Sequence, residues 1–237
     1  MPLKTILFDL DGTLLRMDQE KFIQSYFTAI GRHMEPLGWD SKKLLDAIWH
    51  STGVMMKNDG SRTNEEAFWQ HVCTMYGPNA RDCEPILDEF YRNCFHWVRD
   101  QSCSMDLDAA PVVRRLKELG FRLVLATNPL FPEVCTRQRI AWAGLEPEDF
   151  DLVTTYEHFH FCKPDPRYFS EILDKLGEQP ENCLMVGNDA HEDTCIEALG
   201  VPVFLITRDL LNRHNRDISG YPQGDLKDLL RFVESKQ

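Results

Sequence analysis

The sequence has no excess of positive charge and no long uncharged apolar segment. Lys and Arg number 26 against 38 Asp and Glu, which gives a formal net charge of −12 at pH 7. A surplus of negative charge disfavours general affinity for nucleic acid or anionic membranes. No run approaches the roughly 18 apolar residues of a membrane-spanning helix, and the first apolar run ends at Asp9, too early for the core of a signal peptide. We therefore expect a cytoplasmic protein without nucleic-acid or membrane partners.

The cysteines lack the spacing of a redox or zinc motif. Eight are scattered along the 237 residues, and no two form a CxxC pair. Without an export signal, such cysteines are typical of reduced thiols that serve as small hydrophobic residues. Internal repeats and low-complexity tracts are also missing, so the length favours one α/β core with an insertion.

Short apolar runs separated by helical patterns predict an α/β fold. Runs that suit buried strands lie at 5–8, 121–126, 151–156, 183–187 and 201–206. Helical patterns at 110–120 and 166–177 each end in a glycine suited to a C-terminal cap. Alternating elements of this length predict a doubly wound parallel sheet.

Residues 15–104 interrupt this alternation. Apolar and aromatic residues recur there at helical spacing in four segments without a convincing strand, which predicts a helical insertion domain. The predicted core is then 1–14 with 105–237. We interpret the aromatic residues of the insertion as its own core. The polar segment 54–64 is more typical of an exposed connection than of a substrate-binding loop, in which Lys57 and Asn58 would meet a leaving group.

Two carboxylates follow the first predicted strand, in the segment KTILFDLDGTLL. Asp9 and Asp11 lie where the chain leaves the sheet, and Gly12 allows a tight turn. Ligands of open α/β sheets bind beyond the carboxyl ends of the strands. A pair of this kind can also do no more than accept hydrogen bonds from the following loop, so it needs support from other strand ends.

The other strand ends supply that support. Thr127 and Asn128 follow the second run, Lys163 precedes a helix, and Asp189 and Asp193 follow the fourth run. Each has a simple alternative explanation: an Asn-Pro turn, a solvated lysine, or acidic residues at a helix N-terminus. Together they form the set that phosphoryl transfer needs, namely a nucleophile, oxygen ligands for a metal, hydrogen-bond donors and a cation.

These motifs resemble those of the haloacid dehalogenase-like hydrolases. DxDGT stands at 9–13, Thr-Asn at 127–128, KPDP at 163–166 and a glycine-acid loop at 187–193. The resemblance implies a Rossmann-like core, an α-helical cap inserted between the first two motifs, and a Mg²⁺-dependent phosphatase acting on a small phosphoester.

The resemblance also implies a role for each matching residue. Asp9 would be the nucleophile that forms an aspartyl-phosphate, and Asp11 the acid and base. Lys163 would neutralise charge on Asp9 and on the phosphoryl group. The phosphoryl-binding positions are Gly12, Thr127, Asn128 and Lys163, and the positions around Mg²⁺ are Asp9, Asp11, Asn188, Asp189 and Asp193.

One position departs from the family pattern. The last motif commonly has aspartate after glycine, whereas Asn188 follows Gly187 here. An asparagine oxygen can still bind a hard cation, with one negative charge fewer. We favour Asn188 as the ligand, with Asp189 and Asp193 contributing charge nearby; the alternative is that Asp189 binds the metal directly.

Three alternative functions remain open at this point. A haloacid dehalogenase would need neither a metal nor a proton donor, so Asp11 disfavours it. A phosphomutase would return the phosphoryl group to a sugar rather than to water. A non-catalytic phosphate-binding relative is favoured only by Asn188, against an otherwise complete set of site residues.

Overall fold

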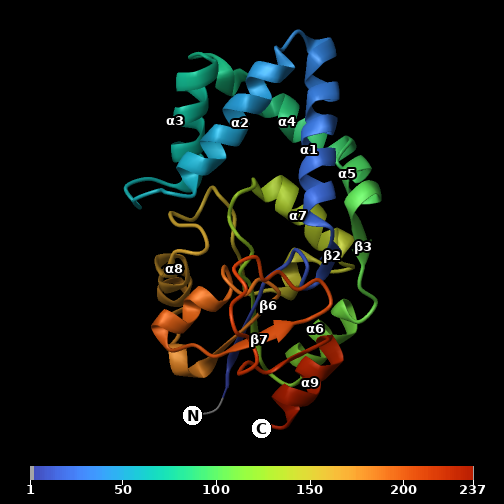
Figure 1. The fold of residues 1–237 in the computed structure, drawn as a ribbon, viewed down its shortest axis with the longest axis vertical. Coiled ribbons are helices and arrows are strands. Elements are labelled where there is room, and N and C mark those ends of the chain that lie inside the picture. Colours follow the sequence, from blue (N-terminus) through green and yellow to red (C-terminus); the bar gives the residue numbers. More distant parts are fainter. Residues whose placement is uncertain (1–2, 237) are drawn as a thin grey trace.

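A parallel sheet forms the base of the molecule in the computed structural model, which describes residues 3–236 (Figure 1). Its strand order is β5-β4-β1-β6-β7-β8. The central strand β1 (Thr5–Phe8) pairs in parallel with β4 (Arg122–Leu125) and β6 (Cys183–Gly187). Further out lie β5 (Leu152–Val153), β7 (Val203–Ile206) and β8 (Gln223–Gly224). Because Phe8 pairs with both Leu125 and Val186, the three central strands end side by side.

Helices cover both faces of the sheet, as side-chain alternation along a strand requires. Ile6 and Phe8 pack in the hydrophobic core that includes α6 (Ala109–Glu118) and α9 (Leu226–Glu234). Leu7 packs in a second core with residues of α8 (Pro166–Leu176). The predicted doubly wound α/β class is confirmed.

Three elements of the core were not predicted from the sequence pattern. Helix α7 (Glu133–Trp142), which lies between the sheet and the upper helices, was not predicted (Figure 1). A 3₁₀-helix, η5 (Thr194–Leu199), follows β6. Strand β8 has only two residues, too few to leave a hydrophobic pattern.

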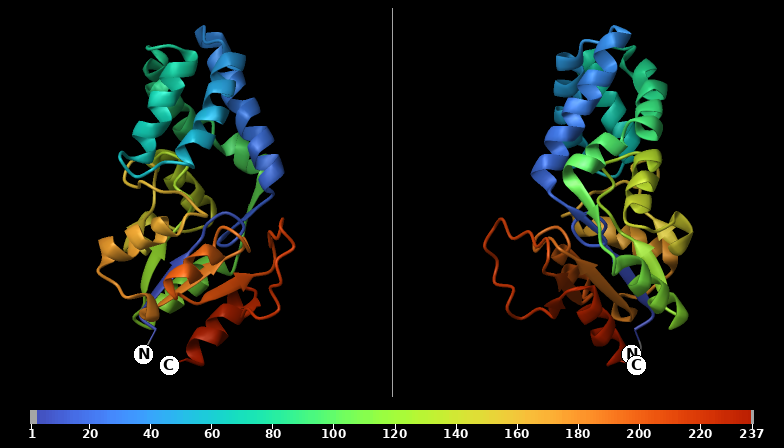
Figure 2. Two further views of the ribbon diagram at one scale, coloured as in Figure 1. Left: turned by 60° about the vertical axis from the view of Figure 1, so that its left-hand side comes forward. Right: turned by 90° about the vertical axis from the view of Figure 1, so that its right-hand side faces the viewer.

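The chain between β1 and β4 carries a group of helices above the carboxyl end of the sheet, which we call the helical insert (19–102; Figures 1 and 2). Four helices were predicted there and five are found, because the seven-residue α5 is too short to show a periodic pattern. Their bounds are α1 (Gln19–Met34), α2 (Ser41–Met55), α3 (Asn64–Tyr76), α4 (Glu84–Asn93) and α5 (His96–Ser102).

The two connections between sheet and helical insert form a small antiparallel ribbon. Strand β2 (Leu15–Met17) pairs with β3 (Cys103–Met105), so Leu15 lies opposite Met105 and Met17 opposite Cys103. Neither strand was predicted, since three residues give no hydrophobic pattern. The two connections therefore run side by side between the sheet and the helical insert, as the right-hand view of Figure 2 shows.

Other predictions concern the chain as a whole. All eight cysteines are free thiols. Between residues 3 and 236, no helix combines the length and apolar character needed to cross a membrane.

Candidate active site

Asp9 lies at the carboxyl end of β1 and contacts a buried lysine. The Nζ atom of Lys163 is 2.9 Å from Asp9 Oδ1 and 2.6 Å from Asp193 Oδ1. All three side chains are buried. Burial alone would lower the pKa of Lys163, but Asp193 and Asp9 hold that pKa well above its ordinary value. The lysine is therefore charged, as a buried cation between two carboxylates must be.

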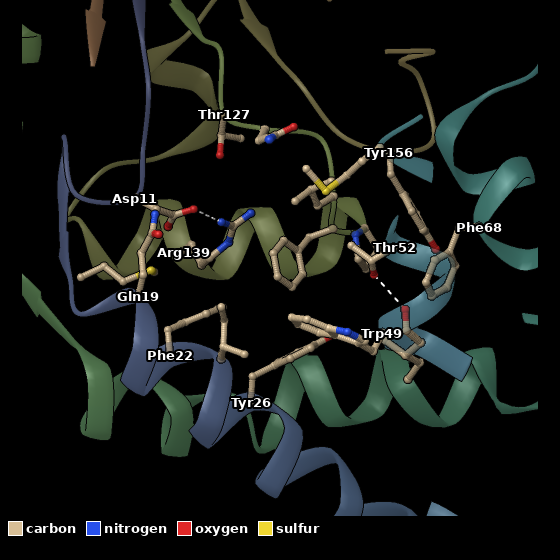
Figure 3. Close-up of a pocket in the computed structure, with 18 of the residues that line it drawn as sticks. Asp11, Gln19, Phe22, Tyr26, Trp49, Thr52, Phe68, Thr127, Arg139 and Tyr156 are labelled. Atoms are coloured by element: carbon tan, nitrogen blue, oxygen red, sulfur yellow. Dashed lines mark hydrogen bonds and ion pairs between the residues drawn. The ribbon is translucent and has the colours of Figure 1, made fainter. Parts of the chain in front are cut away.

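Asn128 fixes the loop that carries Lys163. Its Oδ1 accepts a hydrogen bond from the backbone N–H of Lys163 at 3.1 Å, and its Nδ2 donates to the carbonyl of Lys163 at 3.3 Å. The same amide donates to Glu192 at 3.0 Å. Burial raises the pKa of the Glu192 carboxyl to about 7. In this structure Asn128 orients the lysine loop, and the preceding Thr127 faces the cavity above the sheet (Figure 3).

Asp11 forms an ion pair that the sequence did not reveal. Its Oδ2 accepts a hydrogen bond from Nη1 of Arg139, a residue of α7 with only 1% of its side chain exposed (Figure 3). Burial raises the pKa of Asp11 to about 6, while Arg139 acts in the opposite direction. Oδ1 of Asp11 is buried and has no hydrogen-bond partner within residues 3–236. The arginine stacks over Phe131, with 4.7 Å between its Cζ and the ring centroid.

Thr13 brings two further oxygens together. Its hydroxyl lies 3.4 Å from Asp9 Oδ2 and 3.2 Å from Asn188 Oδ1. The Asn188 amide nitrogen donates to the carbonyl of Asp209 at 2.7 Å, which leaves the amide oxygen directed at the Thr13 hydroxyl. Gly12 has φ +89°, and a Cβ there would collide with Asn188. The turn after β1 thus needs glycine to let Asn188 approach.

The remaining acidic residues of the last motif bond to their own loop and to the lysine. Asp189 Oδ1 accepts hydrogen bonds from the backbone N–H groups of His191 and Glu192, at 2.7 and 3.0 Å. Asp193 Oδ2 accepts one from the N–H of Asp189 at 2.9 Å, and its Oδ1 contacts Lys163. Burial raises the pKa of Asp193 to about 6. Asp189 therefore shapes the loop, and Asp193 orients the lysine.

The donor set fits a hard divalent cation only if carboxylate, amide and carbonyl oxygens are combined. Within residues 3–236 no group of three or more His, Cys, Asp or Glu side chains is arranged to hold a metal ion. Asp9 Oδ2 and Asn188 Oδ1, however, share the Thr13 hydroxyl as a common neighbour. Mg²⁺ prefers such oxygen ligands and keeps several waters. With the backbone carbonyl of Asp11, these atoms could hold Mg²⁺.

A cavity of about 460 Å³ opens above these residues and extends into the helical insert. Asp9, Asp11, Thr127 and Arg139 line its lower end. We call its upper lining the aromatic wall, formed by the rings of Phe22, Tyr26, Trp49, Phe68 and Tyr156 (Figure 3). Aromatic residues of the insertion, which we interpreted as its own core, therefore also border a cavity. In the segment 54–64, Met56 lines the cavity, whereas Lys57 and Asn58 do not.

Sequence reasoning missed Arg139, although one signal was present. In α7 the buried residues include Cys135, Thr136, Arg139 and Ile140, which lie on one helix face. An arginine on an otherwise apolar face needs a buried anion as partner. That partner, Asp11, lies 128 residues earlier in the sequence, so the pair is visible only in three dimensions.

Comparison with known proteins matches this site to a family. A model of the haloacid dehalogenase-like hydrolases matches residues 3–194. Pyrophosphatase PpaX of Bacillus cereus is 27% identical over 197 residues, which cover 81% of this chain and 77% of that protein.

Two solved structures share the fold. A 2-haloacid dehalogenase from Pseudomonas syringae pv. Tomato superimposes with a TM-score of 0.63 at 19% identity, over 99% of both chains. A predicted phosphoglycolate phosphatase from Haemophilus somnus gives 0.58 at 18% identity, over 98% of both chains. At these identities the structures show the fold alone. The family model spans most of the sequence and all four motifs, and the chain therefore belongs to the haloacid dehalogenase-like hydrolases.

Proposed function

We propose that this protein is a Mg²⁺-dependent phosphohydrolase that cleaves small phosphomonoesters through an aspartyl-phosphate on Asp9. The observation that carries the proposal is the position of Asp9 at the end of the central strand, with Lys163 Nζ at 2.9 Å and Thr127 and Asp11 facing the same cavity. The pyrophosphatase relative agrees with phosphorus chemistry. Asp11 favours it over dehalogenation, because a halide leaving group needs no proton.

The reaction would proceed in two displacements at phosphorus. In the first, a carboxylate oxygen of Asp9 bonds to phosphorus as the bond to the leaving oxygen breaks, and Asp11 gives that oxygen a proton. In the second, Asp11 takes a proton from water, whose oxygen bonds to phosphorus as the bond to Asp9 breaks. Lys163 offsets the negative charge that Asp9 and the phosphoryl oxygens bring together, and Thr127 donates to one of those oxygens.

Asp9, the carbonyl of Asp11 and Asn188 would hold Mg²⁺, while Asp189 and Asp193 add negative charge nearby. When bound, the ion supplies a positive charge that lets an anionic phosphoryl group approach the Asp9 carboxylate. Asn188 in place of aspartate leaves this set with one negative charge fewer, so the ion would be bound less tightly than by the common family sequence.

The experiment is to measure phosphate released from an aryl phosphate with Mg²⁺, with excess chelator, and by Asp9→Asn. Because Asn is not a nucleophile at phosphorus, we expect at least about a 10⁴-fold loss of activity. Asp46→Asn is the matched control, since Asp46 is exposed on α2. Activity that survives both Asp9→Asn and chelation would refute the proposal. Halide release from 2-chloropropionate without phosphatase activity would favour a dehalogenase instead.

The helical insert would act as a cap that closes over the site. The β2–β3 ribbon is its connection to the core, and the cavity spans the junction. Closure would exclude bulk water while Asp9 is phosphorylated, and reopening would release the product. The test is limited proteolysis of 15–18 and 102–106 with and without Mg²⁺ and a phosphate mimic; equal cleavage in both states would contradict closure.

A further inference from the structure

The helical insert lines its part of the cavity mainly with ring surface. The aromatic wall (Phe22, Tyr26, Trp49, Phe68 and Tyr156) comes mostly from α1, α2 and α3 and faces the space above Asp11 and Thr127 (Figure 3). Trp49 is 57% exposed, although indole rings are normally largely buried. Its nearest aromatic neighbour, Phe27, meets it edge to face at 5.8 Å, which leaves most of the ring uncovered.

The two hydroxyls of the aromatic wall, and that of the neighbouring Thr52, are already hydrogen-bonded within the protein. The hydroxyls of Tyr26 and Tyr91 lie 2.6 Å apart, and Trp69 Nε1 donates to the Tyr156 hydroxyl at 3.2 Å. The Thr52 hydroxyl donates to a backbone carbonyl in its own helix at 2.9 Å. A leaving group rich in hydroxyls would lose hydrogen bonds to water and find few replacements here.

The charge of the lining also disfavours a second anionic group. Among the described residues of the helical insert, those that line the cavity include neither Lys nor Arg, and the two carboxylates there, Glu84 and Asp88, are ion-paired with Arg81 and Arg92. From the core, Arg139 is paired with Asp11, and the exposed Arg213 donates to Gln19 at the rim. A carboxylate or second phosphate on the leaving group would therefore meet no unpaired buried cation among the described residues that line the cavity.

We infer that the leaving group of the substrate is an uncharged alcohol that carries an aromatic ring, which stacks on the aromatic wall while its phosphate lies at Asp9. This deepens the proposed function and rests on it for the position of the phosphate. A cavity of about 460 Å³ is in the range of small-molecule sites, which are mostly apolar with a few placed polar groups. The lower end would recognise the phosphate, and the wall would select the alcohol.

The test uses phosphonates, because they bind without being hydrolysed. With Mg²⁺ present, calorimetry would compare 2-phenylethylphosphonate with ethylphosphonate, which lacks only the ring. We expect the aromatic compound to bind at least about tenfold more tightly, since it adds ring burial and aromatic contacts. Phosphonoacetate, which carries a carboxylate instead, should bind no more tightly than ethylphosphonate.

Two tryptophans provide matched variants. Trp49→Ala removes an exposed ring of the wall and should lower the aromatic preference by about three- to tenfold. Trp97→Ala removes a tryptophan of similar exposure, 50%, that lies outside this cavity, and should keep the wild-type preference. Phe68→Leu provides a second wall variant of similar bulk and should also lower the preference.

Three outcomes would each overturn the inference. The first is that 2-phenylethylphosphonate and ethylphosphonate bind equally tightly, and the second is that phosphonoacetate binds more tightly than ethylphosphonate. The third is that the two tryptophan variants change the binding ratio by the same factor. The binding ratio does not depend on turnover. If Asp9→Asn left phosphate release unchanged, the proposed function would fail while this ratio could still be measured. Conversely, normal hydrolysis of alkyl phosphates without aromatic preference would refute only the inference.

Discussion

The two ends of the cavity are built from different interactions. At the sheet, Asp9, Lys163 and Asp193 form a buried chain of charges with contacts of 2.9 and 2.6 Å. In the helical insert, rings meet at centroid distances such as 5.8 Å, and one of them, Trp49, is largely exposed. Charges in a low-dielectric environment require fixed geometry, whereas ring contacts tolerate displacement. A reaction centre needs the first property, and a surface that accepts an incoming group needs the second.

The largest effect on stability is expected from Lys163→Met. The substitution leaves the carboxylates of Asp9 and Asp193 buried without their shared cation, and we expect the free energy of unfolding to fall by about 3–5 kcal/mol. Denaturant unfolding would measure it. Lys21→Met is the control, because the pair that Lys21 forms with Asp18 is exposed to solvent and should contribute little to the free energy of unfolding. Equal losses in the two variants would remove the distinction between the two ends.

A smaller loss is expected from Arg139→Met, since it leaves one carboxylate, that of Asp11, without its cation. We expect a decrease of about 2–4 kcal/mol in the free energy of unfolding. Arg137→Met, two residues away on the same helix, removes an arginine with 51% of its side chain exposed and serves as control. If the ion pair causes the loss, adding Asp11→Asn should restore part of it; no recovery in the double variant would contradict this.

The smallest effect is expected within the helical insert. Tyr91→Phe removes the hydroxyl that lies 2.6 Å from that of Tyr26 and leaves the latter buried without this partner. We expect a loss of about 1 kcal/mol in the free energy of unfolding. Tyr221→Phe provides a comparison, because the Tyr221 hydroxyl bonds to Glu197 at the surface. A loss as large as that of Lys163→Met would mean that the wall is as tightly constrained as the charged end.

Sequence patterns revealed the strands because a strand buried on both faces must be apolar along its whole length. Polar residues directly after such strands were equally visible, and in the structure Lys163 contacts both Asp9 and Asn128. Their catalytic and metal-binding roles remain predictions. The pattern around Arg139 could indicate a buried arginine but not that Asp11 is its partner, because the two residues are 128 positions apart in the sequence. The cavity could not be predicted for another reason. Aromatic residues at helical spacing give the same sequence pattern whether their rings fill a core or line a cavity.

The β2–β3 ribbon has a consequence for how this enzyme family can diversify. Leu15 and Met105, where the chain departs from the sheet and returns to it, are paired neighbours. The whole stretch between them is thus covalently joined to the core at one place. A different helical module whose two ends lie equally close could be inserted there without changing the strands of the sheet. Exchanging that module would change which molecules are admitted while the chemical machinery below keeps its own shape.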